Sequence, residues 1–351
     1  MSNRLCHLQN AEKTNLQSAG VSPSVKLHIS ERIDKEQGGD AMAKGLERVI
    51  AVVNGKGGVG KTTITANIGG MLAASGYRVL LVDMDPQGNL AEELGFTQSE
   101  ANDDGLALAQ TLAFGSDPQA IEGIRENLDV LAGGPHLDMA AAGLTMKAQK
   151  DPKGAKTALA AALGQICGNY DLIFIDCPPG QETLQQAALA AARWALIPVK
   201  TDASSRKGLR DVARRLDAVV DINPDLDLLG VVLFGVNRSA RRVSDSARDA
   251  IYRDLGADAP VLSTAIRHAE AAAQESRERG MLSFELEEAV LAAPKWWELR
   301  RSDTQHDGPR SKSAVGLAED FQALGEEIIN RITASEGQGS GEARTMAGGA
   351  R

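Results

Sequence analysis

A glycine-rich loop between an apolar run and a helical pattern constrains the fold of this chain more than any other feature. The apolar run covers residues 49–53, the helical pattern covers 61–75, and the loop between them reads Gly55-Lys56-Gly57-Gly58-Val59-Gly60-Lys61-Thr62-Thr63. Glycines let the main chain wrap closely enough for its N–H groups to surround phosphate oxygens at a helix N-terminus. Lys61 would reach the β- and γ-phosphates, and the Thr62 hydroxyl would hold Mg²⁺. The pattern predicts a nucleoside triphosphate site.

Charge and cysteine content narrow the class of protein. The formal net charge is −9 over 351 residues, so any contact with nucleic acid needs a local basic patch. No apolar run approaches the roughly 18 residues that a membrane span needs, and no secretory signal opens the sequence. The cysteines, Cys6, Cys167 and Cys177, are widely spaced and form no paired motif. We expect a cytoplasmic protein without a membrane segment or an iron–sulfur cluster.

Short apolar runs alternate with longer amphipathic stretches from residue 48 onward. The expected strands are 49–54, 78–83, 128–132, 171–176, 194–199 and 228–234. The expected helices are 61–75, 153–168, 181–192, 203–221, 241–255 and 317–332. This alternation predicts an α/β fold in which a mostly parallel sheet carries helices on both faces. Ligands of such folds bind beyond the carboxyl ends of the strands.

Polar segments bound this alternating region. Residues 1–46 are expected to form a disordered or partly helical extension, with a short helix near 25–36. Residues 47–333 then form one nucleotide-binding domain, with a polar insertion at about 300–314. Residues 334–351 are rich in glycine and small side chains and are expected to be a disordered tail.

Acidic residues follow two of the expected strands. Asp83 and Asp85 lie in the segment DMDPQGN, and Asp176 follows the apolar run 172–175. An aspartate after four apolar strand residues is typical of a Walker B segment, in which it reaches Mg²⁺ through water. The alternative is that Asp83 and Asp85 cap a turn before Pro86. Phosphoryl transfer needs an oriented water more than a strong base, which favours the catalytic interpretation.

Together these motifs resemble those of the ParA/MinD family of P-loop ATPases. The second lysine in KGGVGKTT, the segment DMDPQGN and the aspartate followed by Pro178-Pro179 carry the resemblance, which covers about residues 48–332. It implies the P-loop NTPase fold of the deviant Walker A class, with ATP and Mg²⁺ bound. Where the family often has serine after the proline pair, this chain has Gly180.

The resemblance also implies roles for individual residues. Lys61 and Lys56 would stabilise phosphate charge, with Lys56 reaching across a homodimer to the partner's nucleotide. Thr62, Asp83 and Asp176 would hold the Mg²⁺ shell, and Asp85 would orient the attacking water.

Two further residues resemble the family's base-binding positions. Asn237 follows the strand 228–234, and Arg267 lies in the segment Thr264-Ala265-Ile266-Arg267. The alternative for Asn237 is an ordinary turn asparagine. Ala265 replaces the family's usual proline, so the register around Arg267 departs from the pattern.

Within the family, the motifs resemble those of ParA/Soj-type partition ATPases. This implies an ATP-bound dimer that binds non-specific DNA on the nucleoid and hydrolyses ATP when a ParB-like centromere-binding protein stimulates it. Arg238, Arg241 and Arg242 are the expected DNA contacts, with a second basic cluster over 206–215. A solvated charged face is the alternative for both clusters.

The alternative function is a ParA-like scaffold ATPase that positions a protein cargo. Trp296 and Trp297 are expected to pack an insertion onto the domain, and an exposed partner-binding patch is the alternative.

Overall fold

The computed structural model describes residues 45–202, 212–237, 239–293, 311 and 313–347, with side chains to residue 336. These residues belong to one compact unit within 39–351. Several expectations lie outside the described ranges. They concern residues 1–44 of the extension, most of the 300–314 insertion, Arg238, and the pair Trp296 and Trp297.

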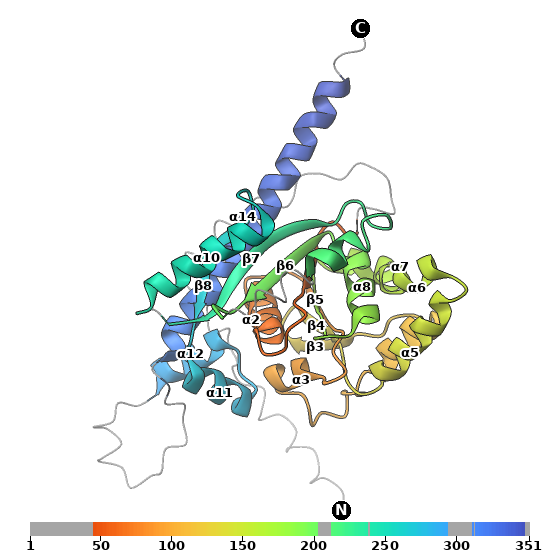
Figure 1. Ribbon diagram of the computed structural model, residues 1–351. Helices are drawn as coiled ribbons and strands as arrows, with labels where there is room; N and C mark the ends of the chain where they lie inside the picture. Colours follow the sequence, from red (N-terminus) through yellow and green to blue (C-terminus); the bar gives the residue numbers. More distant parts are fainter. Residues whose placement is uncertain (1–44, 203–211, 238, 294–310, 312, 348–351) are drawn as a thin grey trace, which may run out of the picture. The chain divides into compact units, whose positions relative to one another are not determined.

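A sheet of eight strands forms the centre of the described residues, in the order β3-β4-β2-β5-β1-β6-β7-β8 (Figure 1). The strands are β1 (Val49–Val52), β2 (Val79–Asp83), β3 (Ile121–Arg125), β4 (Leu128–Leu131), β5 (Leu172–Asp176), β6 (Trp194–Val199), β7 (Asp227–Val236) and β8 (Val261–Arg267). Within this sheet, neighbouring strands are parallel except for β3 and β4. The predicted mostly parallel α/β sheet is confirmed.

The central strands are apolar along their whole length because both of their faces are covered. Every residue of β1, β2, β5 and β6 is buried, as parallel strands between two helical layers require. Register then brings the strand ends together, since Val52 and Asp83 each lie opposite Asp176. Acidic residues far apart in the sequence therefore meet at one edge of the sheet.

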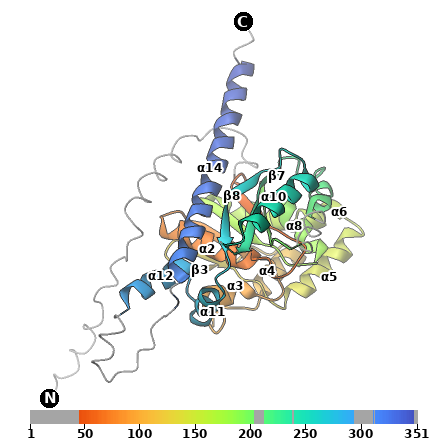
Figure 2. The same cartoon turned by 60° about the vertical axis from the view of Figure 1, so that its left-hand side comes forward.

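Helices lie against both faces of the sheet (Figures 1 and 2). The described helices are α2 (Lys61–Ala74), α3 (Asn89–Leu94), α4 (Leu106–Phe114), α5 (Leu137–Ala148), α6 (Pro152–Lys156), α7 (Ala158–Ile166), η1 (Cys167–Asn169), α8 (Glu182–Ala191), α10 (Arg241–Leu255), α11 (Glu270–Arg279), α12 (Ser283–Ala292) and α14 (Ser313–Ala347). One core joins alternate residues of β1, β2 and β5 to α4, α5, α7, α8 and α10. Helices α2, α12 and α14 pack together elsewhere in the fold.

Several elements differ from those expected. Strands β3 and β8 and helices α3, α4, α5, α11 and α12 were not expected, and the helix expected over 153–168 is divided at Thr157 into α6 and α7. Helices α3 and α4 are each bounded by left-handed glycines at both ends, so they are too short for a clear helical period. The described part of the expected helix 203–221 is helical over 212–217. Helix α14 extends beyond the expected 317–332, through Ala347.

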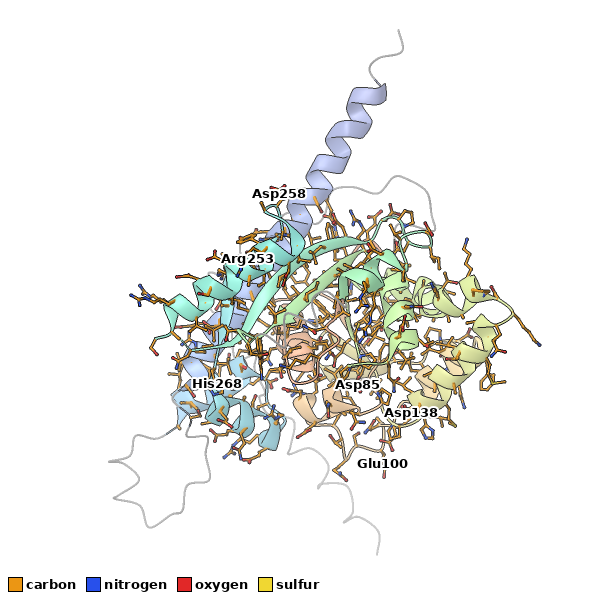
Figure 3. The ribbon with its side chains drawn as sticks, in the orientation of Figure 1. Asp85, Glu100, Asp138, Arg253, Asp258 and His268 are labelled. Carbon is orange, nitrogen blue, oxygen red and sulfur yellow. The ribbon has the colours of Figure 1, made fainter. Side chains whose placement is uncertain are left out.

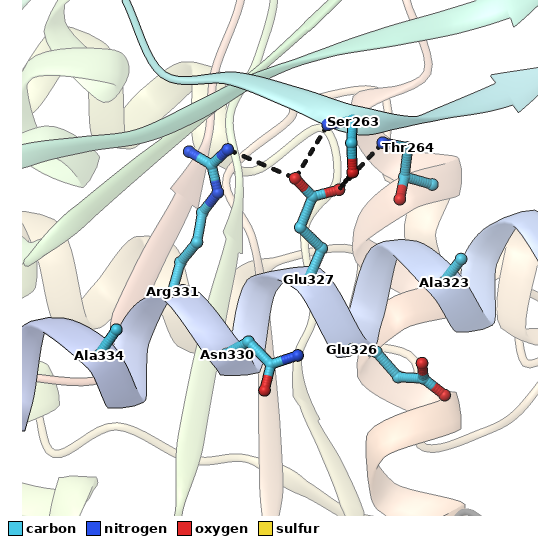
Figure 4. A pocket seen from close by; sticks show the side chains of 8 residues that line it. All are labelled: Ser263, Thr264, Ala323, Glu326, Glu327, Asn330, Arg331 and Ala334. Carbon is cyan, nitrogen blue, oxygen red and sulfur yellow. Dashed lines mark hydrogen bonds and ion pairs between the residues drawn. The ribbon is translucent and has the colours of Figure 1, made fainter.

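Helix α14 covers the outer edge of the sheet at β8 (Figure 4). An edge strand presents backbone groups that no neighbouring strand pairs. The Glu327 carboxylate accepts hydrogen bonds from the Ser263 N–H, the Ser263 hydroxyl and the Thr264 N–H, each at 2.9 Å. Asp320, on the same helix, accepts one from the Arg267 N–H at 2.9 Å. Carboxylates of α14 thus accept backbone N–H groups of β8 that a neighbouring strand would otherwise pair with.

No helix in the described ranges combines the length and the apolar content that crossing a bilayer requires.

Candidate functional site

The glycine loop joins β1 to the N-terminus of α2, as predicted. Gly60 precedes the first residue of α2 with φ of 92°, a left-handed conformation that favours glycine. Its carbonyl accepts the Ile64 N–H at 2.9 Å, which starts the helix. A Cβ atom at this position would lie 2.5 Å from the Phe234 ring. Main-chain conformation and lack of space both require glycine at position 60.

The two loop lysines have different surroundings. Lys61 is buried, and its ammonium donates to the Lys56 carbonyl at 3.2 Å, across the turn of the loop. Burial lowers the pKa of Lys61, and the charge of nearby Asp176 opposes this. The Lys56 ammonium lies 2.9 Å from Asp202, just beyond β6. Lys61 is therefore placed inside the loop, whereas Lys56 is held on its outer side by a carboxylate of the same chain.

Asp83 and Asp176 are adjacent at the ends of β2 and β5, and both are almost completely buried. The Asp83 carboxylate accepts the Asp85 N–H at 2.9 Å and the Leu90 N–H at 3.2 Å. Neither Asp176 oxygen accepts a hydrogen bond from the described residues. Burial raises the pKa of Asp176 to about 7, although the Thr62 hydroxyl and the Lys61 ammonium act in the opposite direction. Burial and the Asp176 charge also raise the pKa of Asp83.

The buried Asp176 oxygens fit a magnesium ion. Buried polar atoms of native proteins almost always have a partner, and Mg²⁺ prefers one or two carboxylates together with phosphate oxygens and water. Thr62, which acts on the Asp176 pKa, supplies a second oxygen close by. In the described residues, no group of three or more acidic, histidine or cysteine side chains is arranged so that it could hold a metal ion without other ligands, so a site here would need phosphate oxygens as well. Bound there, Mg²⁺ would neutralise phosphate charge.

Asp85 is fixed by a tight turn after β2. One of its carboxylate oxygens accepts the Gln87 N–H at 3.0 Å. Its backbone carbonyl accepts the Gly88 N–H at 3.0 Å and the Gly134 N–H at 3.1 Å, the latter from the loop after β4. The Asp85 side chain is nearly buried at the carboxyl edge of the sheet (Figure 3). This geometry supports the turn that the alternative interpretation expects. The Asp85 carboxylate also lies close enough to the phosphate loop for its charge to act on the pKa of Lys61.

Close backbone contacts shape the same edge. A Cβ at Gly133 would lie 2.5 Å from the Asp83 carboxyl carbon, and one at Gly134 would lie 2.5 Å from the Asp104 carbonyl. A Cβ at Gly105 would lie 2.9 Å from the Gly134 nitrogen. The loop of Gly133 and Gly134 therefore approaches both Asp83 and the Asp104 segment at distances that only glycine permits.

A network behind the loop joins α8 to a residue of the 206–215 cluster. Gln185 is fully buried and donates to the Pro178 carbonyl, and Arg215 donates to Gln185. The Arg215 guanidinium lies 3.2 Å from where a Cβ of Gly55 would be. Arg215 thus points toward the phosphate loop. Sequence reasoning missed this role because its partners are about 30 residues or more away.

Cys177 is fully buried, and burial raises the pKa of its thiol. This environment is that of a core residue, because a nucleophilic cysteine needs a lowered pKa.

Glu93 is a second residue that sequence reasoning missed. Its side chain is buried on α3, where it accepts the Thr63 hydroxyl at 2.8 Å. Arg277 of α11 lies 3.9 Å from the same carboxylate oxygen. No sequence motif signals this contact between α3 and the phosphate loop.

Asn237 and Arg267 lie at the same edge, because β7 and β8 pair Val236 with Arg267. The Asn237 side-chain oxygen accepts the Ser239 N–H at 3.1 Å and the Ser239 hydroxyl at 2.8 Å, as in an ordinary turn. The Arg267 guanidinium pairs with Asp320 at 2.6 Å. Both side chains have structural partners, and their roles in base binding remain predictions.

Arg241 and Arg242 open α10 and are exposed. A cavity of about 410 Å³ lies beside them, lined by Thr201, Arg242, Val243, Ser246, Ala247 and Arg253. Arg214 is exposed, whereas Arg206, Lys207 and Arg210 lie outside the described residues.

Comparison with known proteins shows which proteins this chain is similar to. Residues 47–228 match the AAA domain family. An uncharacterized protein of Mycobacterium tuberculosis is 35% identical over 190 residues, which cover 54% of this chain and 58% of that protein. The sporulation initiation inhibitor protein Soj of Bacillus subtilis is 36% identical over 191 residues, which cover 53% of this chain and 72% of Soj. The chain thus spans less than two thirds of the M. tuberculosis relative.

Solved structures agree with these matches. Cobyrinic acid a,c-diamide synthase from Mycobacterium smegmatis, with bound ADP and magnesium, has a TM-score of 0.56 at 31% identity and covers 74% of this chain and 99% of its own. The septum site-determining protein MinD from Pyrococcus horikoshii, complexed with Mg-ADP, has a TM-score of 0.57 at 25% identity. That match covers 80% of this chain and 95% of the MinD chain.

Proposed function

This chain belongs to the ParA/MinD family of P-loop ATPases, and from that premise we propose that it is an ATP-dependent DNA-partitioning ATPase. The observation that carries the catalytic part is the meeting of the glycine loop with Asp83, Asp85 and Asp176 at one sheet edge. Phosphoryl transfer depends on positioning and charge stabilisation, which this edge can provide. The products are ADP and phosphate, and intrinsic turnover is expected to be weak.

Each residue has a distinct part in the proposed reaction. Main-chain N–H groups of residues 55–60 and the Lys61 ammonium surround the phosphates at the start of α2. Asp176 and Thr62 would hold Mg²⁺, and Asp83 fixes the turn by accepting the Asp85 N–H. Asp85 orients the attacking water, since its carboxylate sits in a rigid turn at the strand end.

We propose that ATP builds a homodimer in which Lys56 contacts the partner's nucleotide. Lys56 lies on the outer side of the loop, where a second subunit can reach it, and its ion pair with Asp202 is 33% and 46% exposed at the two side chains. An exposed ion pair contributes little stability. Lys56 can therefore leave Asp202 for a phosphate without a large loss.

The DNA interaction rests on Arg241 and Arg242. Both are exposed at the start of α10. A dimer doubles this basic surface, which makes DNA affinity depend on ATP and fall with salt through counterion release. A ParB-like protein would stimulate hydrolysis and release the dimer from the nucleoid.

Co-sedimentation with non-specific duplex DNA tests the proposal. The protein is compared in ATP and in ADP across a salt titration, and phosphate release is measured in parallel. ATP-dependent binding that weakens with salt is the expected result. Turnover without DNA binding at low salt would replace the proposal with the scaffold ATPase that positions a protein cargo. Absence of turnover would leave an ATP-gated binding module.

A further inference from the structure

We propose that Gln181 is a catalytic residue that orients the attacking water together with Asp85. The inference rests on the proposed ATPase function and extends it to a residue outside the nucleotide motifs. Gln181 follows Gly180 in the loop that leaves the Asp176 strand, immediately before α8. A glutamine can orient an attacking water in phosphoryl transfer, because its amide oxygen accepts a hydrogen bond from that water.

The Gln181 amide is held in a defined orientation. Its nitrogen donates to an Asp138 carboxylate oxygen at 2.9 Å. An ionised carboxylate only accepts hydrogen bonds, so the NH₂ end must face Asp138 and the oxygen must face away from it. The Gln181 backbone N–H is also fixed, by the Pro179 carbonyl at 3.0 Å.

The Gln181 amide oxygen, Oε1, is unusual because it is buried without a hydrogen-bond partner among the described residues. Buried polar atoms in native proteins rarely lack a partner, since an unsatisfied acceptor loses its hydration without compensation. A water molecule is the simplest ligand that satisfies such an acceptor.

The residues around Gln181 contact both the phosphate loop and the loop that meets the Asp85 turn. On one side, Pro179 lies 3.9 Å from the Cβ position of Gly57 in the phosphate loop. On the other, Asp138 lies in the first turn of α5 (Figure 3). The preceding Leu137 N–H donates to the Gly134 carbonyl at 2.9 Å, and the Gly134 N–H donates to the Asp85 carbonyl at 3.1 Å. Gln181 thus follows closely after a proline that lies against the phosphate loop, and its amide is bonded to the helix whose start is tied to the Asp85 turn.

The proposed step balances without a change in the charge of glutamine. The water oxygen bonds to the γ-phosphorus while the bond between that phosphorus and the bridging oxygen breaks. The bridging electron pair remains on ADP. The water proton passes to an oxygen of the departing phosphate, and Gln181 only accepts a hydrogen bond from that water.

Steady-state phosphate release and fluorescent ATP titration of the full chain test the proposal. Gln181→Leu removes donor and acceptor at similar size, and Gln186→Leu is the matched control. Gln186 is also half-buried, on the next turn of α8, and its amide donates to Glu182 at 2.9 Å. We expect Gln181→Leu to lower kcat by about tenfold to a hundredfold, which is at or below the roughly 10²–10⁴-fold contributed by a general acid or base, because Gln181 only orients the water. ATP affinity should stay within about twofold of the parent. The control should retain the parental kcat.

A second variant tests the anchoring of the amide. Asp138→Ala keeps the Gln181 side chain but removes the hydrogen bond that holds its amide in one orientation. We therefore expect a smaller loss of kcat, by about threefold to tenfold. An unchanged kcat in Gln181→Leu, or equal losses of kcat and ATP affinity, would overturn the proposal. A parent protein without turnover would instead refute the proposed function, and this inference with it.

Discussion

Replacing Glu327 with glutamine tests whether α14 stabilises the sheet through its carboxylates. In the parent, the carboxylate accepts three hydrogen bonds from Ser263 and Thr264, and Arg331 lies 3.3 Å away (Figure 4). In Glu327→Gln, one acceptor becomes an NH₂ group that faces backbone donors. At least one N–H of the edge strand then loses its acceptor.

The expected loss can be worked from these contacts. A hydrogen bond to a charged group contributes about 1.5–3 kcal/mol, and an unsatisfied buried donor costs about 1–3 kcal/mol. The Glu327 side chain is 17% exposed, so water replaces part of the lost interaction. We therefore expect the free energy of unfolding to fall by about 2 kcal/mol, which lowers Tm by roughly 4–8 °C for a domain of this size.

The effect should depend on pH with a defined sign. Burial raises the pKa of Glu327, but hydrogen bonds from Ser263 and Thr264 lower it by more, so the pKa lies below its ordinary value. A carboxylate with a lowered folded pKa adds stability above its unfolded pKa of about 4.3, and that stability is lost as pH falls through the folded pKa. The difference between parent and variant should be full at pH 7 and shrink below about pH 4.

Urea unfolding followed by circular dichroism measures this difference, with Glu326→Gln as the control. Glu326 is the exposed neighbour on α14 and accepts a hydrogen bond from Gln322. The control should change the unfolding free energy by less than about 0.5 kcal/mol. Equal effects of the two substitutions, or a difference that persists unchanged in acid, would refute the reasoning.

Three further predictions concern the nucleotide site and the DNA surface. Asp85→Ala should retain ATP binding but lower kcat by about a hundredfold, and phosphate release at the parental rate would contradict its role. Arg241→Glu with Arg242→Glu should abolish DNA co-sedimentation while ATP-dependent dimerisation, followed by light scattering, is unchanged; retained binding would remove these residues from the DNA interface. Gly60→Ala should lower the unfolding free energy by about 2–5 kcal/mol, because a left-handed alanine costs about 1–2 kcal/mol and overpacking against Phe234 about 1–3 kcal/mol. Thermal unfolding within 2 °C of the parent would contradict that estimate.

The central sheet and the phosphate loop could be predicted from the sequence because their signals are local. Four buried strands read as continuous apolar runs, and the glycine loop lies directly between one of them and a helix. Parallel pairing then places Asp83 beside Asp176 without further information, since the strand ends share one edge.

The partners of individual side chains could not be predicted in the same way. Arg267 was expected at the nucleotide base, yet its guanidinium pairs with Asp320, 53 residues later in the sequence. Arg215 was expected on a basic surface, yet it donates to Gln185 beneath the phosphate loop. Both assignments depend on how helices pack on the sheet. A basic residue carries no local signal that distinguishes a buried ion pair or hydrogen bond from a surface contact.

The close contacts of glycines around Asp83 determine which positions near the carboxyl edge of the sheet can accept a substitution and which cannot. At Gly105, Gly133 and Gly134, even an alanine would collide with backbone or with the Asp83 carboxyl group. Residues 97–101, on the segment between α3 and α4, are exposed and touch none of these contacts. Substitutions in that exposed segment should therefore be tolerated more readily than any side chain at the three glycines, which are fixed by the packing around Asp83.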